Sequence, residues 1–236
     1  VLTKNPNGQP NHFASLSESG VKSGDQVVIA DEEWEDMAAL NGAKNVTISA
    51  IEGKSVTWRG PGSPKNGQNS LLAVHNCDAL RISGIKFVAN EHIEYCLRFS
   101  GRCPAGIIEN CHFSDANTSN MMFKDCVSES NRPLILRNSR FVETSNSKCK
   151  SAVLFETTPT TPKPGQATSL NRDISVRDCR FEGPYSLATV IFAGSMVNVN
   201  LSNNKLFDAK DGILFRKARP EVDMQATISN NTFHSF

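Results

Sequence analysis

A six-residue pattern that recurs in this chain has a basic side chain at its fifth position. That position is lysine, arginine or histidine in five of the six copies. Lysine and arginine bind carboxylates and sulfates, and the guanidinium group does so with paired N–H donors. The fifth positions are Lys86, His112, Arg140, Arg180, Lys205 and Thr232, and the second position adds Arg137 and Arg177.

Stacked copies of the pattern would place these side chains in a ladder. Because neighbouring parallel strands lie about 4.8 Å apart, we expect Arg137, Arg140, Arg177 and Arg180 to form one patch with about 5 Å between coils. Such a patch would bind an anionic polysaccharide or glycan, and binding would weaken as the salt concentration rises. The predicted ligand-binding residues are Lys86, Arg137, Arg140, Arg177, Arg180 and Lys205.

The same ladder has a second interpretation, in which acidic side chains of the protein itself neutralise its positive charges. Like charges at strand spacing repel one another unless an anion or an acidic side chain lies between them. A self-compensated surface ladder would bind nothing and would contribute little to stability. The acidic candidates for this role are Glu109, Glu143, Asp173 and Glu182.

A dense basic run, Arg216-Lys-Ala-Arg-Pro220, suggests a catalytic alternative. A lyase acting on uronate polysaccharides needs a lysine or arginine base beside the acidic proton, and often Ca²⁺ held by acidic residues. Arg216, Lys217 and Arg219 are the catalytic candidates, and a solvated charged loop is the other interpretation. No acidic cluster accompanies them, so we expect Ca²⁺ only if the chain is a lyase, and otherwise no metal or cofactor.

Other catalytic patterns are missing from the sequence. The aspartates at 173, 178, 208 and 211 match neither the paired carboxylates of a glycosidase nor the arrangement expected of a pectin esterase. There is also no P-loop, dinucleotide fingerprint, serine nucleophile elbow or kinase signature. This stretch is therefore not itself a kinase or another nucleotide enzyme.

The six copies of the pattern define an internal repeat. Their closing residues are separated by 26, 28, 40, 25 and 27 residues. A second phrase, with endings such as Leu97-Arg-Phe99 and Val153-Leu-Phe155, recurs between them, so each repeat holds at least two short β-prone runs. The copies are Ile82-Ser-Gly-Ile-Lys-Phe87, Ile108-Glu-Asn-Cys-His-Phe113, Leu136-Arg-Asn-Ser-Arg-Phe141, Val176-Arg-Asp-Cys-Arg-Phe181, Leu201-Ser-Asn-Asn-Lys-Leu206 and Ile228-Ser-Asn-Asn-Thr-Phe233.

Short strands at this period predict a solenoid. A right-handed parallel β-helix with about 25 residues per coil suits the spacing, because each coil buries its apolar side chains on the next. Leucine-rich repeats need a Leu-x-x-Leu-x-Leu frame that is absent. We expect seven to eight coils, with the six phrases stacked in one sheet and their closing residues in one interior column.

The third position of the phrase is Gly, Asn or Asp in every copy. These residues accept left-handed backbone angles, which a chain needs where it turns a corner between strands. Stacked amides can also form a hydrogen-bonded ladder. We therefore expect this column to be structural and not catalytic.

On these phrases the chain resembles the pectin-lyase-like superfamily of right-handed β-helices, from Gly24 onward. The first coils, around Gly24 to Ala30, Val56 to Gly60 and Leu80 to Gly84, are similar in rhythm to β-helical lyases of alginate and chondroitin. The superfamily includes lyases, hydrolases, esterases and non-enzymatic binding modules. The resemblance therefore implies the fold, and activity has to be argued from a site.

Length and composition predict one elongated all-β domain. The chain has 236 residues, of which 39% are hydrophobic, and a net charge of +1. That charge gives no general attraction to nucleic acid, and no apolar run approaches the ~20 residues of a membrane span. We expect a cap at residues 1–26 and the β-helix at residues 27–236 with a Pro/Thr-rich loop at residues 157–170. The segment from Asp31 to Asp36 predicts either a short helix or a wide turn packed by Trp34.

Three expanded loops fall at one corner of the predicted coil, at residues 124–133, 157–165 and 216–225. Insertions on one edge of a solenoid often contact ligands. An equally good interpretation is that these loops are surface insertions that the fold tolerates and that have no function. The last coil would leave an open edge, which predicts a cap, further sequence or end-to-end self-association.

Seven cysteines leave at least one thiol unpaired. Cys111 and Cys179 share one slot of the phrase, which indicates packing columns, and no paired Cys-x-x-Cys zinc spacing occurs. The spacing is less regular for Cys96, Cys103 and Cys149, so the sequence leaves open whether a disulfide forms. The compartment is undecided on this basis, and an extracytoplasmic or cell-surface location is favoured over the cytoplasm.

The sequence thus favours a non-catalytic module that binds carbohydrate or an acidic glycan. We expect it to be a piece of a larger bacterial protein, and β-helices of this type are also appended to protein kinases. A polysaccharide lyase acting on uronate polymers is one alternative. A structural spacer or assembly module is the other.

Overall fold

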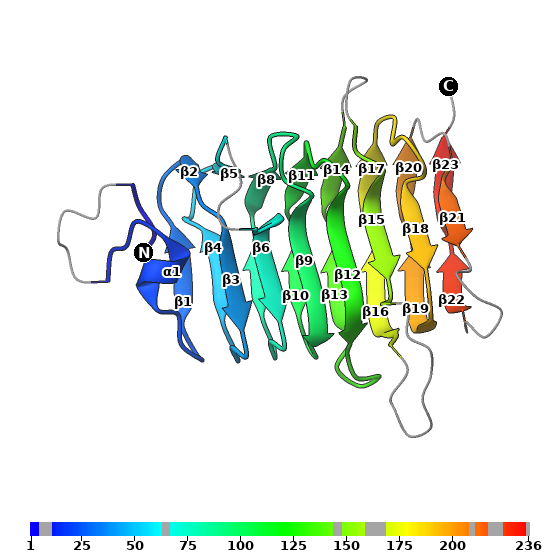
Figure 1. Ribbon diagram of the computed structural model, residues 1–236, viewed down its shortest axis with the longest axis horizontal. Coiled ribbons are helices and arrows are strands. Elements are labelled where there is room, and N and C mark those ends of the chain that lie inside the picture. Colours follow the sequence, from blue (N-terminus) through cyan, green and yellow to red (C-terminus); the bar gives the residue numbers. More distant parts are fainter. Residues whose placement is uncertain are drawn as a thin grey trace.

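The computed structural model describes residues 1–4, 11–62, 67–143, 148–158, 169–207, 211–216 and 224–234. The chain winds as a parallel β-helix whose axis runs horizontally in Figure 1, from the first coil in blue to the last in red. Eight strands stack on one face of the described structure. This number agrees with the seven to eight coils expected from the sequence. The predicted all-β fold is confirmed.

Each of the first seven coils contributes one strand to each of three faces, and the last described strands, β22 and β23, lie on faces 1 and 2. Every strand pairs in parallel with its counterparts in neighbouring coils. Face 1 holds β1 (Gln26–Ile29), β4 (Thr47–Ala50), β7 (Arg81–Ser83), β10 (Ile107–Glu109), β13 (Leu134–Arg137), β16 (Asn171–Arg177), β19 (Met196–Ser202) and β22 (Met224–Ser229). Face 2 holds β2 (Glu33–Glu35), β5 (Val56–Arg59), β8 (Ile85–Val88), β11 (His112–Ser114), β14 (Arg140–Val142), β17 (Arg180–Glu182), β20 (Lys205–Phe207) and β23 (Thr232–His234). Face 3 holds β3 (Ala38–Asn41), β6 (Ser70–His75), β9 (Tyr95–Arg102), β12 (Ser119–Val127), β15 (Ser151–Glu156), β18 (Val190–Ala193) and β21 (Ile213–Arg216).

The repeated phrase turns the corner between faces 1 and 2. Its third position has a positive φ in every copy, as at Asn110 (55°) and Asn138 (48°), which confirms the expected corner. The expectation that the phrases stack within one sheet was wrong. The left-handed residue bends the chain, so the first half of each phrase lies on face 1 and the second half on face 2.

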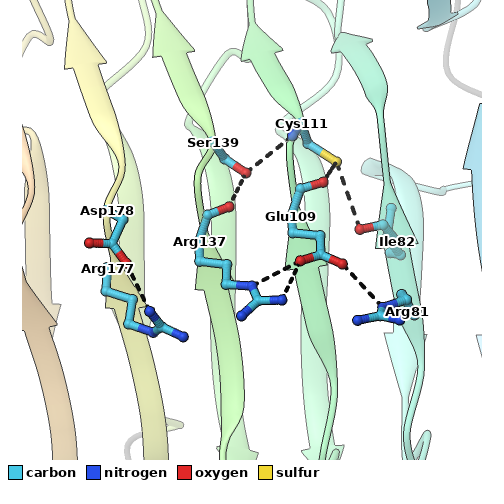
Figure 2. Close-up of polar contacts among 8 residues, drawn as sticks. All are labelled: Arg81, Ile82, Glu109, Cys111, Arg137, Ser139, Arg177 and Asp178. Carbon is cyan, nitrogen blue, oxygen red and sulfur yellow. Dashed lines mark hydrogen bonds and ion pairs between the residues drawn. The ribbon is translucent and has the colours of Figure 1, made fainter.

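A hydrogen-bonded ladder follows this corner at the fourth position, not the third. The backbone N–H of Cys111 donates to Ser139 Oγ at 3.2 Å (Figure 2), and the N–H of Cys179 donates to Asn204 Oδ1 at 2.9 Å. The N–H of Asn204 donates in turn to Asn231 Oδ1 at 2.9 Å. The third residue forms the left-handed turn, whereas the side chain of the fourth residue points into the core. There it can accept a hydrogen bond from a buried backbone N–H, which needs a partner.

Two aromatic stacks fill the interior. The closing residues of the phrase are in register, as with Phe87, Phe113 and Phe141, whose successive ring centroids lie 5.4 and 4.7 Å apart. This confirms the predicted interior column from Phe87 to Leu206, whereas Phe233, the last predicted member, is in register but 55% exposed. Each fully buried ring contributes about 1.5–3 kcal/mol relative to an exposed one. A second stack runs under face 3 and comprises Phe99, Phe123, Phe155, Phe192 and Phe215.

The N-terminal residues lie against the first coil. Leu2 pairs with Ile29, and Leu16 of the short helix α1 (Leu16–Ser19) is 2% exposed. The segment around Trp34 is strand β2, not a helix. Trp34 is buried and packs its ring against Trp58 at 4.5 Å, which agrees with the expected wide turn.

All seven cysteines are buried, and none forms a disulfide. Burial raises the pKa of both the Cys111 and Cys179 thiols to about 12. Neutral buried thiols are poor nucleophiles, so these two side chains act as packing groups.

Among the described residues, no helix is long and apolar enough to cross a membrane. The C-terminal end of the β-helix is the most open part of the described core. Phe215, Ile228 and Phe233 are 46, 40 and 55% exposed.

Candidate functional site

A groove of about 340 Å³ runs along the outer surface of face 3. Its residues come from five successive coils, from β9 to β21, and four strand spacings of about 4.8 Å make it roughly 19 Å long. The lining residues are Glu94, Tyr95, Thr118, Lys150, Ser151, Leu154, Glu156, Leu187, Ile191, Ala193 and Arg216.

The floor of this groove follows from strand alternation. Val153 and Phe155 point into the core, so Leu154 and Glu156 point outward. Leu154 is in register with Ile191, which gives an apolar strip. Glu156, Ala193 and Arg216 form the adjacent outward ladder, in which the small Ala193 leaves a gap between two charged side chains.

One wall of the groove is the corner that leads into face 3. The N–H of Thr118 donates to Glu94 O at 3.1 Å, and the N–H of Lys150 donates to Thr118 O at 2.9 Å. The N–H of Leu187 continues the series to Lys150 O at 3.2 Å. The wall therefore presents one side chain per coil on a backbone that is hydrogen-bonded from coil to coil.

Positive and negative groups balance within the groove. Glu94 and Glu156 carry two negative charges, and Lys150 and Arg216 carry two positive charges. Tyr95 lies on β9, in the same coil as Glu94 at the start of the groove, and is 8% exposed. Burial, and then the charges of Glu94 and Glu156, raise the pKa of Tyr95 to about 12, so its phenol stays protonated and can donate a hydrogen bond at neutral pH.

A polar network holds Glu94 at the rim. Asn69 Nδ2 donates to Glu94 Oε2 at 2.8 Å, and Arg98 Nη1 donates to Asn69 Oδ1 at 3.5 Å. Lys124 Nζ lies 3.5 Å from Glu156 Oε2 on the outward ladder. These contacts orient both carboxylates before any ligand arrives.

The groove can therefore offer hydroxyl, amine, guanidinium and carboxylate groups above an apolar strip. Tyr95 and Lys150 also supply the residue types that proton transfer needs. Within the described part of the chain, no group of three or more His, Cys, Asp or Glu side chains has the arrangement of a metal site.

Comparison with solved structures shows the same architecture elsewhere. An alginate lyase from Paenibacillus sp. strain FPU-7 matches 90% of this chain and 70% of its own, with a TM-score of 0.53 and 14% identity. A pectin methylesterase variant in complex with a hexasaccharide matches 90% of this chain and 80% of its own, with a TM-score of 0.50 and 9% identity. The chain therefore shares the right-handed parallel β-helix fold with these two structures. No family model and no curated protein sequence matches the chain.

The predicted basic ladder lies elsewhere on the β-helix and is divided by the asparagine corner. Arg137 and Arg177 are in register on face 1, whereas Arg140 and Arg180 are in register on face 2. The expectation of one stack of four guanidiniums was wrong, because the second and fifth positions of the phrase fall on different faces. Lys86 and Lys205 lie with the face 2 pair.

On face 1, acidic side chains compensate the arginines. Figure 2 shows Glu109 between Arg81 and Arg137, with Arg81 Nε 3.1 Å from Glu109 Oε1 and Arg137 Nε 2.9 Å from Glu109 Oε2. Arg177 Nη1 lies 2.8 Å from Asp178 Oδ2. Glu109 thus has the neutralising role predicted for it.

On face 2, Arg140 and Arg180 both pair with Glu182. Burial alone would raise the pKa of the Glu182 carboxyl, but hydrogen bonds from Arg180 and Arg140 outweigh it, so the pKa lies below its usual value. The Arg180 guanidinium also lies 4.1 Å above the Phe207 ring. Burial, followed by the charges of Lys86 and Arg140, lowers the pKa of His112.

Two predicted acidic partners have other roles. Glu143 is buried and accepts from Asn120 Nδ2 at 2.8 Å, and Asp173 accepts from Asn198 Nδ2 at 3.0 Å.

The catalytic candidates are only partly covered by the structure. Arg216 lines the groove, whereas Lys217 and Arg219 lie outside the described residues, as does most of the Pro/Thr-rich loop, at residues 159–168. Sequence reasoning missed Glu94, Tyr95, Lys150 and Glu156. One sequence feature could have identified part of the groove. The residue after the closing Phe of the second phrase points outward on face 3, as at Glu156 and Arg216.

Proposed function

We propose that this β-helix is a non-catalytic carbohydrate-binding module that holds an extended glycan in the face 3 groove. The groove itself carries the proposal: five coils each contribute lining groups over an apolar strip, which suits a polymer whose successive units meet successive coils. Its wider setting as part of a larger bacterial protein stays a prediction.

An acidic glycan fits this groove best. Lys150 and Arg216 line it and have no ion pair among the described residues, so their charge is available to carboxylates of the ligand. The two similar structures support this choice, since one is an alginate lyase and the other a pectin methylesterase with a bound hexasaccharide. The arginines of faces 1 and 2 are less suited, because acidic side chains already occupy them.

Retention on immobilised alginate, pectate and chondroitin sulfate tests the proposal. We expect salt-sensitive retention that Lys150→Ala with Arg216→Ala abolishes, while the circular dichroism spectrum stays unchanged. Lys86→Ala with Lys205→Ala removes the same charge from face 2 and serves as the matched control. Retention that survives the first double variant and disappears in the control would place the ligand on face 2 instead.

A uronate lyase is the second candidate, favoured by one observation. Tyr95, with a pKa of about 12, stays protonated and lies in the same groove as Lys150. Such a pair suits proton donation and abstraction in β-elimination. The test is the absorbance of unsaturated uronate ends after incubation with alginate, pectate and chondroitin. Turnover that is lost in Tyr95→Phe would favour the lyase. If the unaltered chain cleaves none of the three polymers, the binding module is the better interpretation.

A further inference from the structure

A second groove, on the outer surface of face 1, is not involved in the proposed function. It has a volume of about 510 Å³ and spans three coils, through β13, β16 and β19. It lies on a different face from the groove described above. Its lining residues are Ser130, Pro133, Ile135, Asp173, Ile174, Ser175, Arg177, Asn198 and Asn200.

A buried carboxylate lies in this groove. Asp173 is 7% exposed, and its Oδ1 accepts a hydrogen bond from Asn198 Nδ2 at 3.0 Å. Both residues have left-handed backbone angles, with φ of 54° and 53° in adjacent coils. No salt bridge to Asp173 occurs among the described residues. A buried charge needs hydrogen bonds, and one donor satisfies only part of a carboxylate's capacity.

A second acceptor in this groove is also incompletely satisfied. The Oδ1 atom of Asn200 is buried, and no group in the described residues donates to it. Buried polar atoms of folded proteins nearly always have a partner, so an orphan lining a groove indicates a ligand or solvent donor. Ile135, Ser175 and Asn200 are in register, which places an apolar, a hydroxyl and an amide side chain on consecutive coils.

The charge of the groove constrains what can bind there. Arg177 is paired with Asp178 at 2.8 Å, so these two charges cancel and Asp173 leaves one negative charge. An acidic glycan is therefore disfavoured. Ca²⁺ needs about six to eight oxygen ligands and usually several carboxylates, whereas this groove offers one.

We propose that the face 1 groove binds adjacent hydroxyl groups of a neutral saccharide. The hydroxyls donate to Asp173, which has one donor, and to Asn200 Oδ1, which has none among the described residues. Ser175 supplies a further hydroxyl, and the apolar C–H surface of the sugar packs on Ile135 and Pro133. With an acidic glycan on face 3, the module would join two different polysaccharides.

Calorimetric titration of the full chain with neutral hexamers of glucose, mannose, galactose and xylose tests this site. We expect at least one hexamer to bind. Asn200→Ala and Asp173→Asn should each weaken that binding about tenfold, because each removes a hydrogen bond worth about 1.5 kcal/mol. Ser202→Ala, on the same strand but outside the groove, should leave it unchanged, and circular dichroism checks the fold of each variant.

The site is separable from the proposed function by one further variant. Lys150→Ala alters the face 3 groove and should not change binding of the neutral hexamer. The inference is overturned if no hexamer binds, if Asn200→Ala binds as tightly as the unaltered chain, or if Lys150→Ala removes the binding. Loss of binding on addition of EDTA would also overturn it, in favour of a cation site.

Discussion

Faces 2 and 3 of the β-helix both carry ladders of charged side chains, yet they differ in what those charges contact. On face 2, Arg140 and Arg180 share Glu182, which lies two residues along the strand in the neighbouring ladder, and about half of each arginine side chain is exposed to solvent. On face 3, a wall of corner residues rises beside the ladder and leaves Lys150 and Arg216 facing a groove. A row of basic residues in a sequence is therefore not a binding face by itself, because acidic neighbours in adjacent coils decide how much charge is free.

The two faces also differ in the role of small side chains. On face 3, Ala193 interrupts the outward ladder between Glu156 and Arg216. On face 2, long side chains occupy the matching ladder without a gap, from Arg140 through Arg180 to Lys205. Shape as well as charge separates the two surfaces.

The largest expected effect concerns the core beneath face 2. Phe141→Ala should lower the free energy of unfolding by about 3–5 kcal/mol, because it leaves a cavity within a continuous ring stack. Leu154→Ala, on the floor of the face 3 groove, should cost less because Leu154 points outward. Urea unfolding followed by circular dichroism measures both. An equal loss in the two variants would show that the groove floor is part of the structural core.

Filling the gap on face 3 should have the next largest effect. Ala193→Leu keeps every charge but occupies the space between Glu156 and Arg216, so acidic-glycan affinity should fall about tenfold, or about 1.4 kcal/mol. Ala73→Leu places the same side chain on the outward surface of β6, outside the groove, and is the matched control. Affinity electrophoresis in alginate gels compares them. Equal mobility of both variants and the unaltered chain would show that groove shape does not matter.

The sequence predicted the repeating architecture well and the groove poorly, for one physical reason. Core packing and corner angles repeat in every coil, so Phe113 and Asn110 carry a periodic signal. The groove wall comes from the corners before face 3, where Glu94, Thr118 and Lys150 follow no shared phrase. The basic positions are also periodic. The alternation of side chains along a strand did not reveal, however, that the left-handed corner puts Arg137 and Arg140 on different faces.

Acid should destabilise face 2 through Glu182. Its folded-state pKa is lowered, so its favourable contribution is fully present above the unfolded-state pKa of about 4.3 and is lost as pH falls through the lower folded-state value. Arg140 and Arg180 are 54 and 50% exposed, so solvent limits that contribution to about 1 kcal/mol.

Urea midpoints between neutral pH and pH 3 measure the effect. The unaltered chain should lose more stability over this range than Glu182→Gln, which has no carboxylate to protonate. Glu33→Gln, at an exposed pair with Arg59, serves as the control and should follow the unaltered chain. Parallel curves for Glu182→Gln and the unaltered chain would refute the assignment.

The smallest effect is expected for Arg140→Ala with Arg180→Ala. Both guanidiniums are about half exposed and already paired, so their removal should change stability by less than about 1 kcal/mol per pair. The variant leaves Glu182 unpaired and makes face 2 more acidic, but at 0.15 M salt the Debye length is about 8 Å, so this charge should have little influence on a ligand held on face 3. Elution from immobilised alginate at that salt concentration should therefore be unchanged. Earlier elution of this variant, with Lys150→Ala and Arg216→Ala eluting normally, would make the ladder of face 2 the glycan-binding face despite its ion pairs.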